Sequence, residues 1–378
     1  MRQIICLSTS DYRPVPTRKQ NVMSRLKDAE ILYFDPPVTW IAPLKDRNAL
    51  RKIFAWRRPG EQVKENITVY ATPPVLPFFN RYRWINRINQ RLLAGYLKKR
   101  MKQHGFTDPL LWCYSPSSCD LVDRVPSGGL VYDCVDRHSA YRGMIRPEVV
   151  DQMERELARK ADQVFCTAQG LYDTLVRENP NTGLIPNGAA YELFSRVFDL
   201  PPDPDRSKPV FGFVGMLQEC IDYQCLAAVA DAFPEGRVVI IGRRLPGVDL
   251  TELQAKKNVV FKGLVPQEEL PEHMREFHVC LNVFREGRLS QDVSPLKFYE
   301  YLATGRPVVS TKEPLQVNDY ADVVYVADSP AEFVIQCEKA LRENDPPKSE
   351  KRREYGKTCS WTERVREMES ILEKRRLT

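Results

Sequence analysis

Short apolar runs alternate with helix-like segments along most of this 378-residue chain, and the alternation occurs in two series. Continuous apolar strands separated by helices are typical of parallel sheets that are covered on both faces. Two such series in tandem predict two Rossmann-like domains. The strands are expected at residues 2–8, 30–34, 67–71, 110–114, 129–133 and 163–167, and then at 209–215, 236–242, 258–261, 278–284, 306–310 and 322–326.

The break between the two series is a proline-rich stretch with four prolines in residues 201–209. Such a stretch continues neither a helix nor a central strand, so it predicts a stiff linker. We expect a first domain over 1–195, a linker over 196–209 and a second domain over 210–360. The tail 361–376 has apolar residues at helical spacing and predicts a helix that packs on one of the domains.

Composition excludes several classes of protein. The apolar fraction of 43% is too high for a largely disordered chain. No apolar run is long enough to span a membrane, and the first residues do not have the pattern of a signal peptide. The ten cysteines form no C-x-x-C and the four histidines have no ligand spacing, so we expect reduced thiols in a cytoplasmic protein and no structural zinc.

Several tempting motifs fail on inspection. Gly356-Lys357-Thr358 has the end of a P-loop, but the required earlier glycine is Lys351. No G-x-G-x-x-G follows a strand, which disfavours a dinucleotide dehydrogenase, and no G-x-S-x-G is present. The acidic pair Asp203 and Asp205 lies in the proline-rich linker, so we interpret it as coincidence.

The informative stretch is Asp292-Val-Ser-Pro-Leu-Lys-Phe-Tyr-Glu300. Ser294 followed by Pro295 predicts a helix that begins here, and Lys297 and Glu300 then share one face. A helix N-terminus suits a phosphate, and a lysine in its first turn opposes the helix dipole unless an anion is bound. Asp292 and Glu300 are placed to accept hydrogen bonds from sugar hydroxyls. A well-capped surface helix with solvated charges is the alternative.

Charge is divided unequally along the chain. Residues 1–190 hold 29 basic and 19 acidic side chains, a net of +10, whereas residues 191–378 carry −4. Residues 67–106 contain no acid and eight bases. Within the helix-like stretch 81–102, apolar residues are expected on one side and cations elsewhere. That pattern suits an anionic bilayer surface, and it also suits nucleic acid or a core helix with a solvated basic face. The apolar residues are Trp84, Ile85, Ile88, Leu92, Leu93, Tyr96 and Leu97.

Several separated segments, in order, resemble GT-B glycosyltransferases of the family 4 type, close to enzymes of teichuronic-acid and exopolysaccharide assembly. The segments include RKQNVMSRL, EILYFDPP, VYDCVDRHSAY, LIPNGAAYELF, GFVGMLQECIDYQCL and residues 258–310. The resemblance implies a GT-B fold, that is, two Rossmann-like domains facing a cleft, with the helix 361–376 crossing back to the first domain. It implies a nucleotide sugar, a UDP-sugar, as the donor.

The resemblance also implies roles for the donor domain. Glu300 would bind the nucleotide ribose and Asp292 the donor sugar, where the family usually has Glu. The loop that begins at Gly215 lacks the cations found in many relatives, so Lys297 and Arg243 are assigned to the diphosphate. The remaining donor-binding positions are the helix start at Ser294 and the backbone at Leu264 and Val265, which would meet the base.

In the first domain, Asp133, Asp136 and His138 follow an expected strand, at the carboxyl end where α/β sites form. Asp136 is assigned to the acceptor hydroxyl and His138 to the sugar or the developing charge, and ordinary loop residues are the alternative. Arg13 and Arg18 are weaker candidates that would face the cleft.

The resulting expectation is a retaining, metal-independent hexosyltransferase with no cofactor. It would transfer a sugar to a saccharide or lipid-linked saccharide in cell-surface polysaccharide assembly. Glycan assembly on a lipid carrier favours the membrane interpretation of residues 81–102 over nucleic acid, and implies a peripheral position on the inner face of the plasma membrane. The alternatives are a sugar-nucleotide epimerase on the same fold and a non-catalytic GT-B binding protein.

Overall fold

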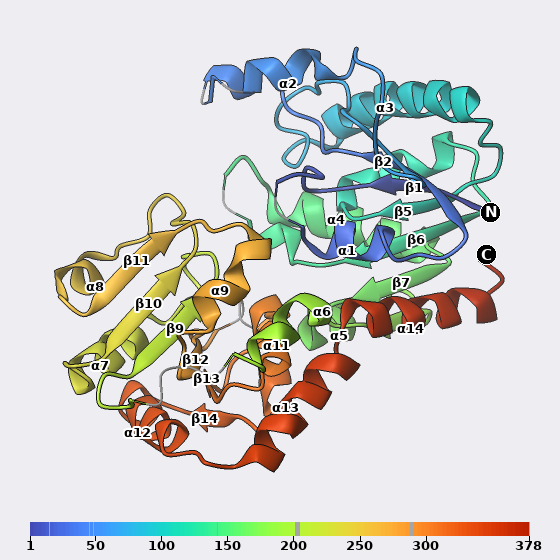
Figure 1. The fold of residues 1–378 in the computed structure, drawn as a ribbon. Helices are drawn as coiled ribbons and strands as arrows, with labels where there is room; N and C mark the ends of the chain where they lie inside the picture. The colour runs from blue at the N-terminus through green and yellow to red at the C-terminus, as the bar shows by residue number, and fades with distance from the viewer. Residues whose placement is uncertain are drawn as a thin grey trace. The chain divides into compact units, whose positions relative to one another are not determined.

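The structure is a computed structural model that describes residues 1–14, 16–44, 46–47, 49–141, 143–200, 205–287 and 291–377. The chain divides into two compact units (Figure 1). Unit 1 consists of Met1–Ile185 and Val365–Thr378, and unit 2 of Pro186–Arg364. The division falls before the expected boundary at residue 195. The expected tail helix corresponds to α14, Trp361–Lys374, whose residues from Val365 onward belong to unit 1.

In the described part of unit 1, eight strands form one sheet with the order β3-β4-β2-β1-β5-β6-β7-β8. Neighbouring strands are parallel except for β3 and β4, which are antiparallel. The strands are β1 Arg2–Leu7, β2 Ala29–Phe34, β3 Glu61–Lys64, β4 Ile67–Tyr70, β5 Leu110–Cys113, β6 Gly129–Cys134, β7 Gln163–Cys166 and β8 Thr182–Leu184. The helices are α1 Arg18–Met23, α2 Ala49–Ala55, α3 Arg83–His104, α4 Pro147–Lys160 and α5 Gln169–Leu175, with 3-10 turns at Ala42–Leu44, Pro116–Asp120, Val122–Arg124 and His138–Ala140.

Unit 2 contains a second parallel sheet, which has six strands among the described residues, in the order β11-β10-β9-β12-β13-β14. The strands are β9 Val210–Val214, β10 Arg237–Ile241, β11 Val259–Gly263, β12 Val279–Asn282, β13 Val308–Thr311 and β14 Tyr325–Ala327. The helices are α6 Tyr191–Phe194, α7 Tyr223–Ala232, α8 Thr251–Ala255, α9 Leu270–Met274, α11 Leu296–Ala303, α12 Pro330–Leu341 and α13 Pro346–Thr358, with 3-10 turns at Ser195–Val197, Gln267–Glu269 and Leu315–Tyr320.

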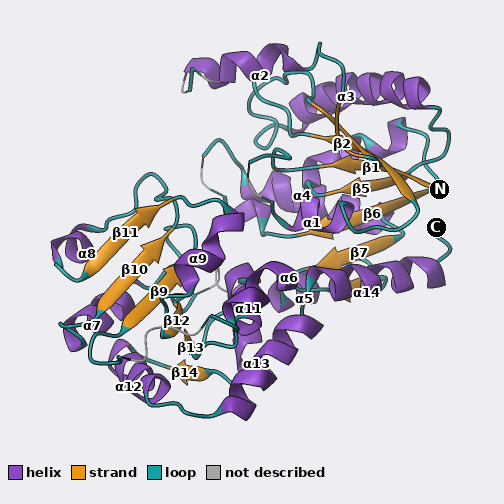
Figure 2. Ribbon diagram, viewed as in Figure 1, coloured by secondary structure: helices purple, strands orange, loops and turns teal. Residues whose placement is uncertain are grey.

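In each unit the strands form one layer with helices on both sides (Figure 2). This arrangement confirms the two Rossmann-like sheets that the apolar runs predicted, because every expected strand is present. The central strands β5, β6 and β7 are buried along their whole length, as strands covered on both faces must be. The edge strands β3 and β8 were not expected from the sequence. The expected linker overlaps the 3-10 turn Ser195–Val197, and its residues 201–204 lie outside the described residues.

Helix α4 buries the apolar stripe that its spacing predicts, with Met153 and Leu157 inaccessible to solvent. Helix α3 corrects a prediction. Its buried side contains Ile85, Leu93 and Leu97, whereas Trp84, Ile88 and Leu92, which were expected on the same apolar side, are exposed. All ten cysteines are free, as the absence of paired motifs indicated. Among the described residues, none of the helices has the length and hydropathy needed to cross a bilayer.

Candidate active site

On the donor side, the loops that follow β9, β10 and β11 meet at the carboxyl edge of the unit 2 sheet. The Gly215 N–H donates to the Ile241 carbonyl at 2.9 Å, and the Gly242 N–H donates to the Gly263 carbonyl at 2.8 Å. A Cβ atom at Gly242 would lie 1.7 Å from the Gly215 carbonyl oxygen, so only glycine permits this approach. The predicted donor residue Gly215 therefore lies on a closely packed backbone platform.

Helix α11 follows these loops, and its start differs from the expectation by one residue. Pro295, rather than Ser294, occupies the N-cap position, and no side chain caps the helix there. The Ser294 hydroxyl instead accepts a hydrogen bond from the Asn187 N–H at 3.0 Å, and the Asn187 amide donates to the Ser294 carbonyl at 2.9 Å. Ser294 thus ties α11 to the start of unit 2, which leaves the first amides of the helix without a side-chain cap.

Glu300 on α11 is a fully buried carboxylate with two polar partners. Its Oε2 lies 2.6 Å from the Lys297 ammonium, and its Oε1 accepts from the Gln267 amide at 3.0 Å. Burial raises the pKa of Glu300, whereas Lys297 and Gln267 act in the opposite direction. Lys297 and Glu300 share one helix face, as predicted. The ion pair gives Lys297 a second role, because a buried carboxylate requires a cation whether or not an anionic ligand is bound.

The other predicted donor residues lie in the loops after β10 and β11 and in the turn before α11. Asp292 is buried in the turn before α11. Arg243, in the loop after β10, is exposed, and its side chain makes no hydrogen bond or ion pair with the described residues. Leu264 is exposed and Val265 is half-buried in the loop after β11. Arg243 and the 264–265 backbone are therefore accessible for ligand contacts.

On the acceptor side, Arg18 and Asp133 are paired in the interior of unit 1. The Arg18 Nε donates to both Asp133 carboxylate oxygens at 2.9 and 3.0 Å, and its Nη1 donates to the Ile185 carbonyl at 2.9 Å. The two side chains are only 3% and 0% exposed. The expectation that they face an open cleft therefore needs correction. Because the two side chains are buried and their opposite charges are paired with each other, we interpret Arg18 and Asp133 as structural residues.

Asp136 and His138 lie just beyond β6, near Lys19 of α1. Asp136 accepts a hydrogen bond from the Tyr141 hydroxyl at 2.9 Å, and burial raises the pKa of its carboxyl group. His138 is buried, and burial together with the nearby Lys19 charge lowers its pKa to about 4. Its imidazole is therefore neutral at physiological pH. Lys19 is also buried, which lowers its own pKa, and no carboxylate among the described residues lies within ion-pair distance of its ammonium group.

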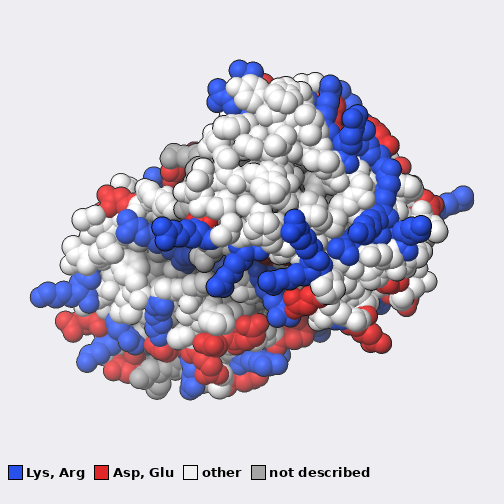
Figure 3. Space-filling view, turned by 90° about the horizontal axis from the view of Figure 1, so that it is seen from above, with Lys and Arg blue, Asp and Glu red and all other residues white. Residues whose placement is uncertain are grey.

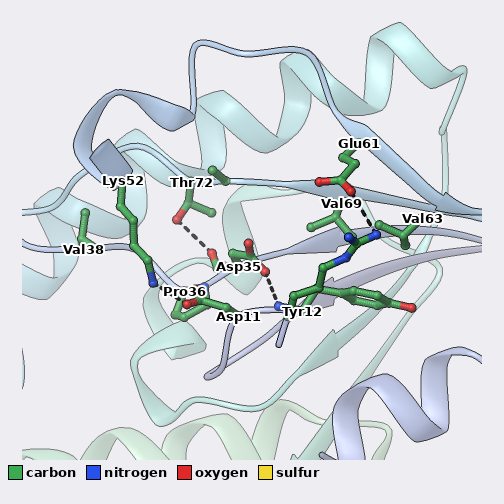
Figure 4. A pocket seen from close by; sticks show the side chains of 12 residues that line it. Asp11, Tyr12, Asp35, Pro36, Val38, Lys52, Glu61, Val63, Val69 and Thr72 are labelled. Carbon is green, nitrogen blue, oxygen red and sulfur yellow. Dashed lines mark hydrogen bonds and ion pairs between the residues drawn. The ribbon is translucent and has the colours of Figure 1, made fainter. Parts of the chain in front are cut away.

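Two cavities of unit 1 are lined by residues at the carboxyl ends of its strands. One, of about 260 Å³, has a largely apolar wall and is lined by His138, Tyr141 and the inner face of α3. The other, of about 250 Å³, has a mixed polar and apolar lining from the loops after β1, β2 and β4 and from β3 (Figure 4). Arg13 lines this second cavity, where it pairs with Glu61 at 3.1 Å. Arg13 therefore lies in a different cavity from His138.

Asp35 lines both cavities and was not singled out from the sequence. Its Oδ1 accepts from the Tyr12 N–H at 2.9 Å, as Figure 4 shows, and burial raises its pKa to about 6. Its place directly after β2 was the available signal, since polar residues gather at the carboxyl ends of parallel strands. Gln267, Asn187 and Lys19 were also missed, because their roles arise only from tertiary contacts. No group of three or more metal-ligating side chains occurs among the residues that the structure describes.

Comparison with known proteins shows which proteins this chain is similar to. Residues 208–343 match the family described as "Glycosyl transferases group 1". A Bacillus subtilis (strain 168) protein described as a teichuronic acid biosynthesis glycosyltransferase, TuaH, is 28% identical over 273 residues, which cover 66% of this chain and 68% of the relative.

Solved structures match nearly the whole chain in fold. A trehalose-6-phosphate structure from E. coli bound with UDP-2-fluoro glucose gives a TM-score of 0.71 at 12% identity, covering 98% of this chain and 99% of the other. Anabaena HepE in complex with UDP and glucose gives 0.63 at 14% identity, covering 99% of each chain. The lipopolysaccharide outer core galactosyltransferase WaaB gives 0.62 at 12% identity, covering 98% and 99%.

The fold is therefore GT-B, with two parallel α/β sheets in two units. The family match covers the unit that contains α11 and the buried Lys297–Glu300 pair. The fold is that of GT-B glycosyltransferases, and residues 208–343 are similar to the group 1 glycosyltransferase family.

The buried Arg18–Asp133 pair generates a stability prediction. Arg18→Met leaves an uncompensated buried carboxylate and should lower the free energy of unfolding of unit 1 by about 3–5 kcal/mol. Arg159→Met is the matched control, because Arg159 is 60% exposed in its pair with Glu178 and should cost less than about 1 kcal/mol. Urea unfolding followed by tryptophan fluorescence measures both variants. Equal midpoints for Arg18→Met and the wild type would show that the pair contributes nothing to stability.

Proposed function

We propose that this glycosyltransferase transfers a sugar from a UDP-sugar to a hydroxyl of a saccharide or lipid-linked saccharide in cell-surface polysaccharide assembly. The observation that carries the proposal is the buried Glu300 carboxylate, which is paired with Lys297 and hydrogen-bonded to Gln267. These residues lie in the part of unit 2 that matches the glycosyltransferase family. Structural neighbours bound to UDP and to a UDP-sugar analogue support this nucleotide as the donor. The B. subtilis relative supports a cell-surface polysaccharide pathway.

In this proposal each donor group meets a distinct part of unit 2. Glu300 accepts hydrogen bonds from the ribose, which replace the one it receives from Gln267. Lys297, Arg243 and the uncapped first amides of α11 bind the diphosphate. The base contacts the backbone at Leu264 and Val265, and the sugar contacts Asp292. Gly215 and Gly242 contribute no side chains of their own, so their backbone is assigned to the approach of the phosphates.

Transfer then proceeds with retention and without a metal ion. The bond between the anomeric carbon and the β-phosphate oxygen breaks, and a bond from the acceptor oxygen to the same face of that carbon forms. Negative charge that develops on the leaving UDP is stabilised by the α11 amides and by Lys297. These groups take the part that a divalent cation takes in metal-dependent enzymes.

On the acceptor side we assign Asp136 to the acceptor hydroxyl and neutral His138 to a hydrogen bond with the transferred sugar. The raised pKa of Asp136 suits a group that receives a proton, because its conjugate acid is stable enough to form during the reaction. The acceptor proton passes to Asp136 or to the departing phosphate. Arg13 and the cavity that it lines are available to the more distant part of the acceptor.

The site of action that we propose is the inner face of the plasma membrane, with the protein in the cytoplasm. Segment 81–102 lies within the acid-free stretch of the sequence, and several of its cations are exposed on α3. Such a surface attracts anionic lipids at about 1 kcal/mol per cation. A lipid-linked acceptor would be presented at that same surface.

The donor assignment predicts the effect of Glu300→Ala on nucleotide binding. The change removes the ribose acceptor and frees Lys297, which by itself would favour a phosphate. UDP affinity measured by calorimetry should nevertheless fall at least tenfold, since hydrogen bonds to a charged group contribute about 1.5–3 kcal/mol. Glu268→Ala, an exposed glutamate in the adjacent turn, is the control and should bind UDP as the wild type does. Unchanged affinity of Glu300→Ala would remove Glu300 from the donor site.

The metal-free scheme predicts that transfer survives chelation. The rate measured with a UDP-sugar and a saccharide acceptor in excess EDTA should equal the rate in added Mg²⁺ or Mn²⁺, because α11 and Lys297 supply the positive charge. Activity that disappears with EDTA and returns with Mn²⁺ would contradict the scheme. Conversion of the donor to an epimer in the absence of acceptor would instead identify an epimerase.

The acceptor assignment predicts a pH dependence. Deprotonated Asp136 is required, so the transfer rate should fall as the pH is lowered through its pKa, which burial places above the ordinary aspartate range. Asp136→Asn should lower kcat by about 10²–10⁴ and abolish that acid limb. His138→Gln should leave the limb in place, because the limb is assigned to the Asp136 carboxyl group and burial lowers the pKa of His138 to about 4, which keeps its imidazole neutral near pH 7. An acid limb that persists in Asp136→Asn would assign the proton to another group.

A further inference from the structure

The exposed side of α3 bears a line of large apolar side chains. Trp84, Ile88 and Leu92 are spaced four residues apart, so they follow one another along the helix surface, and Trp84 and Leu92 are 60% and 59% exposed. Side chains of this size on a solvated helix face lose the free energy that burial would give them. The opposite side of α3 already packs against the sheet, so the core does not explain this line.

A second group of exposed apolar side chains lies in and before α2. Leu44 is 86% exposed, and Trp40, Leu50 and Phe54 are about half exposed. This region is tied to α3: the Trp40 N–H donates to the Val75 carbonyl, the Asn89 side chain of α3 bonds both the N–H and the carbonyl of Leu76, and the Tyr96 hydroxyl reaches the Trp56 carbonyl. We call the combined area the α2–α3 surface. Its apolar members are Trp40, Leu44, Leu50, Phe54, Phe78, Tyr82, Trp84, Ile88 and Leu92.

Exposed cations border this area. Figure 3, which views the molecule from the side of α2 and α3, shows an uncharged area with lysines and arginines along its edge. Two cations of segment 81–102 are not part of this border, because Arg83 is paired with Asp120 and Arg100 lies over the rings of Tyr70 and Tyr96. The exposed cations are Arg51, Lys52, Arg57, Arg58, Arg81, Arg87, Arg91, Lys98, Lys99 and Lys102.

We propose that the α2–α3 surface inserts its apolar side chains into an anionic lipid bilayer while its cations contact the headgroups. The Trp and Leu side chains suit the apolar region just below the membrane surface, and the surrounding Lys and Arg side chains suit the anionic headgroups. This goes beyond the charge attraction stated above, because it gives the attachment an apolar part that salt does not screen. This insertion proposal rests on the proposed function in one respect, namely that a lipid-linked acceptor would be located in a membrane.

Other occupants fit the surface less well. A second copy of the chain would bring two cationic borders together, and like charges oppose that contact. Nucleic acid could use the cations and the aromatic rings of this surface, but it would leave the aliphatic side chains of Leu44, Ile88 and Leu92 without an apolar partner. A bilayer satisfies both the apolar area and its cationic border.

The placement has a consequence for the acceptor. The largely apolar cavity of about 260 Å³ is lined by Leu93 and Leu97 on the inner face of α3, the helix whose outer face would insert, and by His138. Docking through α3 would therefore hold the His138 cavity at the level of the lipid headgroups. A lipid-linked saccharide could reach that cavity without leaving the bilayer.

The test is sedimentation of the full chain with vesicles of phosphatidylcholine containing about one third phosphatidylglycerol. The double variant Trp84→Glu with Leu92→Glu should bind at least tenfold more weakly, because each change removes an apolar contact and adds a charge that anionic lipid repels. Ile335→Glu is the matched control, since Ile335 is equally exposed on α12 of unit 2 and should leave binding unchanged. Both substituted positions in α3 are exposed, and an unaltered melting temperature verifies folding.

Salt and fluorescence separate insertion from simple charge attraction. Wild-type protein should remain partly bound in high salt, and lipids brominated in the acyl chain should quench the tryptophan fluorescence of the wild type more than that of Trp84→Glu. Full release by salt with no quenching, or equal vesicle binding by the double variant, would overturn the proposal. UDP calorimetry on the double variant keeps this test apart from the enzymatic one, because the UDP residues lie in unit 2 and their binding should not change.

Discussion

The positions of the candidate acceptor residues in unit 1 depend on one buried ion pair. Arg18 and Asp133 are separated by 115 residues in sequence, and Arg18 also reaches the carbonyl of Ile185, 167 residues away. The pair thus joins α1, the end of β6 and the last residue of the first segment of unit 1. Lys19 follows Arg18 directly, and Asp136 and His138 follow Asp133 by a few residues, so the pair also fixes where these candidate groups lie. Positioning of this kind explains why two full charges remain in the interior despite their desolvation cost.

Unit 2 also contains a buried ion pair, at the candidate donor site, but a ligand could replace one of the hydrogen bonds of this pair. Glu300 is inaccessible to solvent, and its charge is balanced by Lys297 and by the Gln267 amide. A ribose diol could replace the Gln267 bond without leaving the carboxylate unpaired, because Lys297 stays attached to the other oxygen. Residues 191–378, most of which form unit 2, carry −4, so the proposed anion site would arise from local geometry. In the proposed scheme, the uncapped amides of α11 and the paired Lys297 would bind the diphosphate although the net charge of this part of the chain is unfavourable.

The sequence predicted the parallel strands well because most of them are apolar runs that tertiary contacts bury on both faces. It failed at β3 and β8, where Glu61–Lys64 and Thr182–Leu184 are short edge strands with no apolar excess. It placed the start of α11 one residue early, since Ser294 bonds to Asn187 instead of capping the helix. Lys19, Gln267 and Asp35 were missed because partners far away in sequence, or cavities that only the folded chain forms, give them their interest.

The α3 error is the most instructive, because periodicity reports an apolar side but not what covers it. Residues 84, 88 and 92 and residues 85, 93 and 97 lie next to one another on the helix, and the sequence pattern joins them into one broad side. The sheet of unit 1 covers only the second group. An apolar side wider than the sheet beneath it, on a segment with no acidic residue, needs a second apolar environment that also tolerates positive charge. An anionic bilayer meets both requirements, and it is the environment in which an acceptor attached to a lipid would be found.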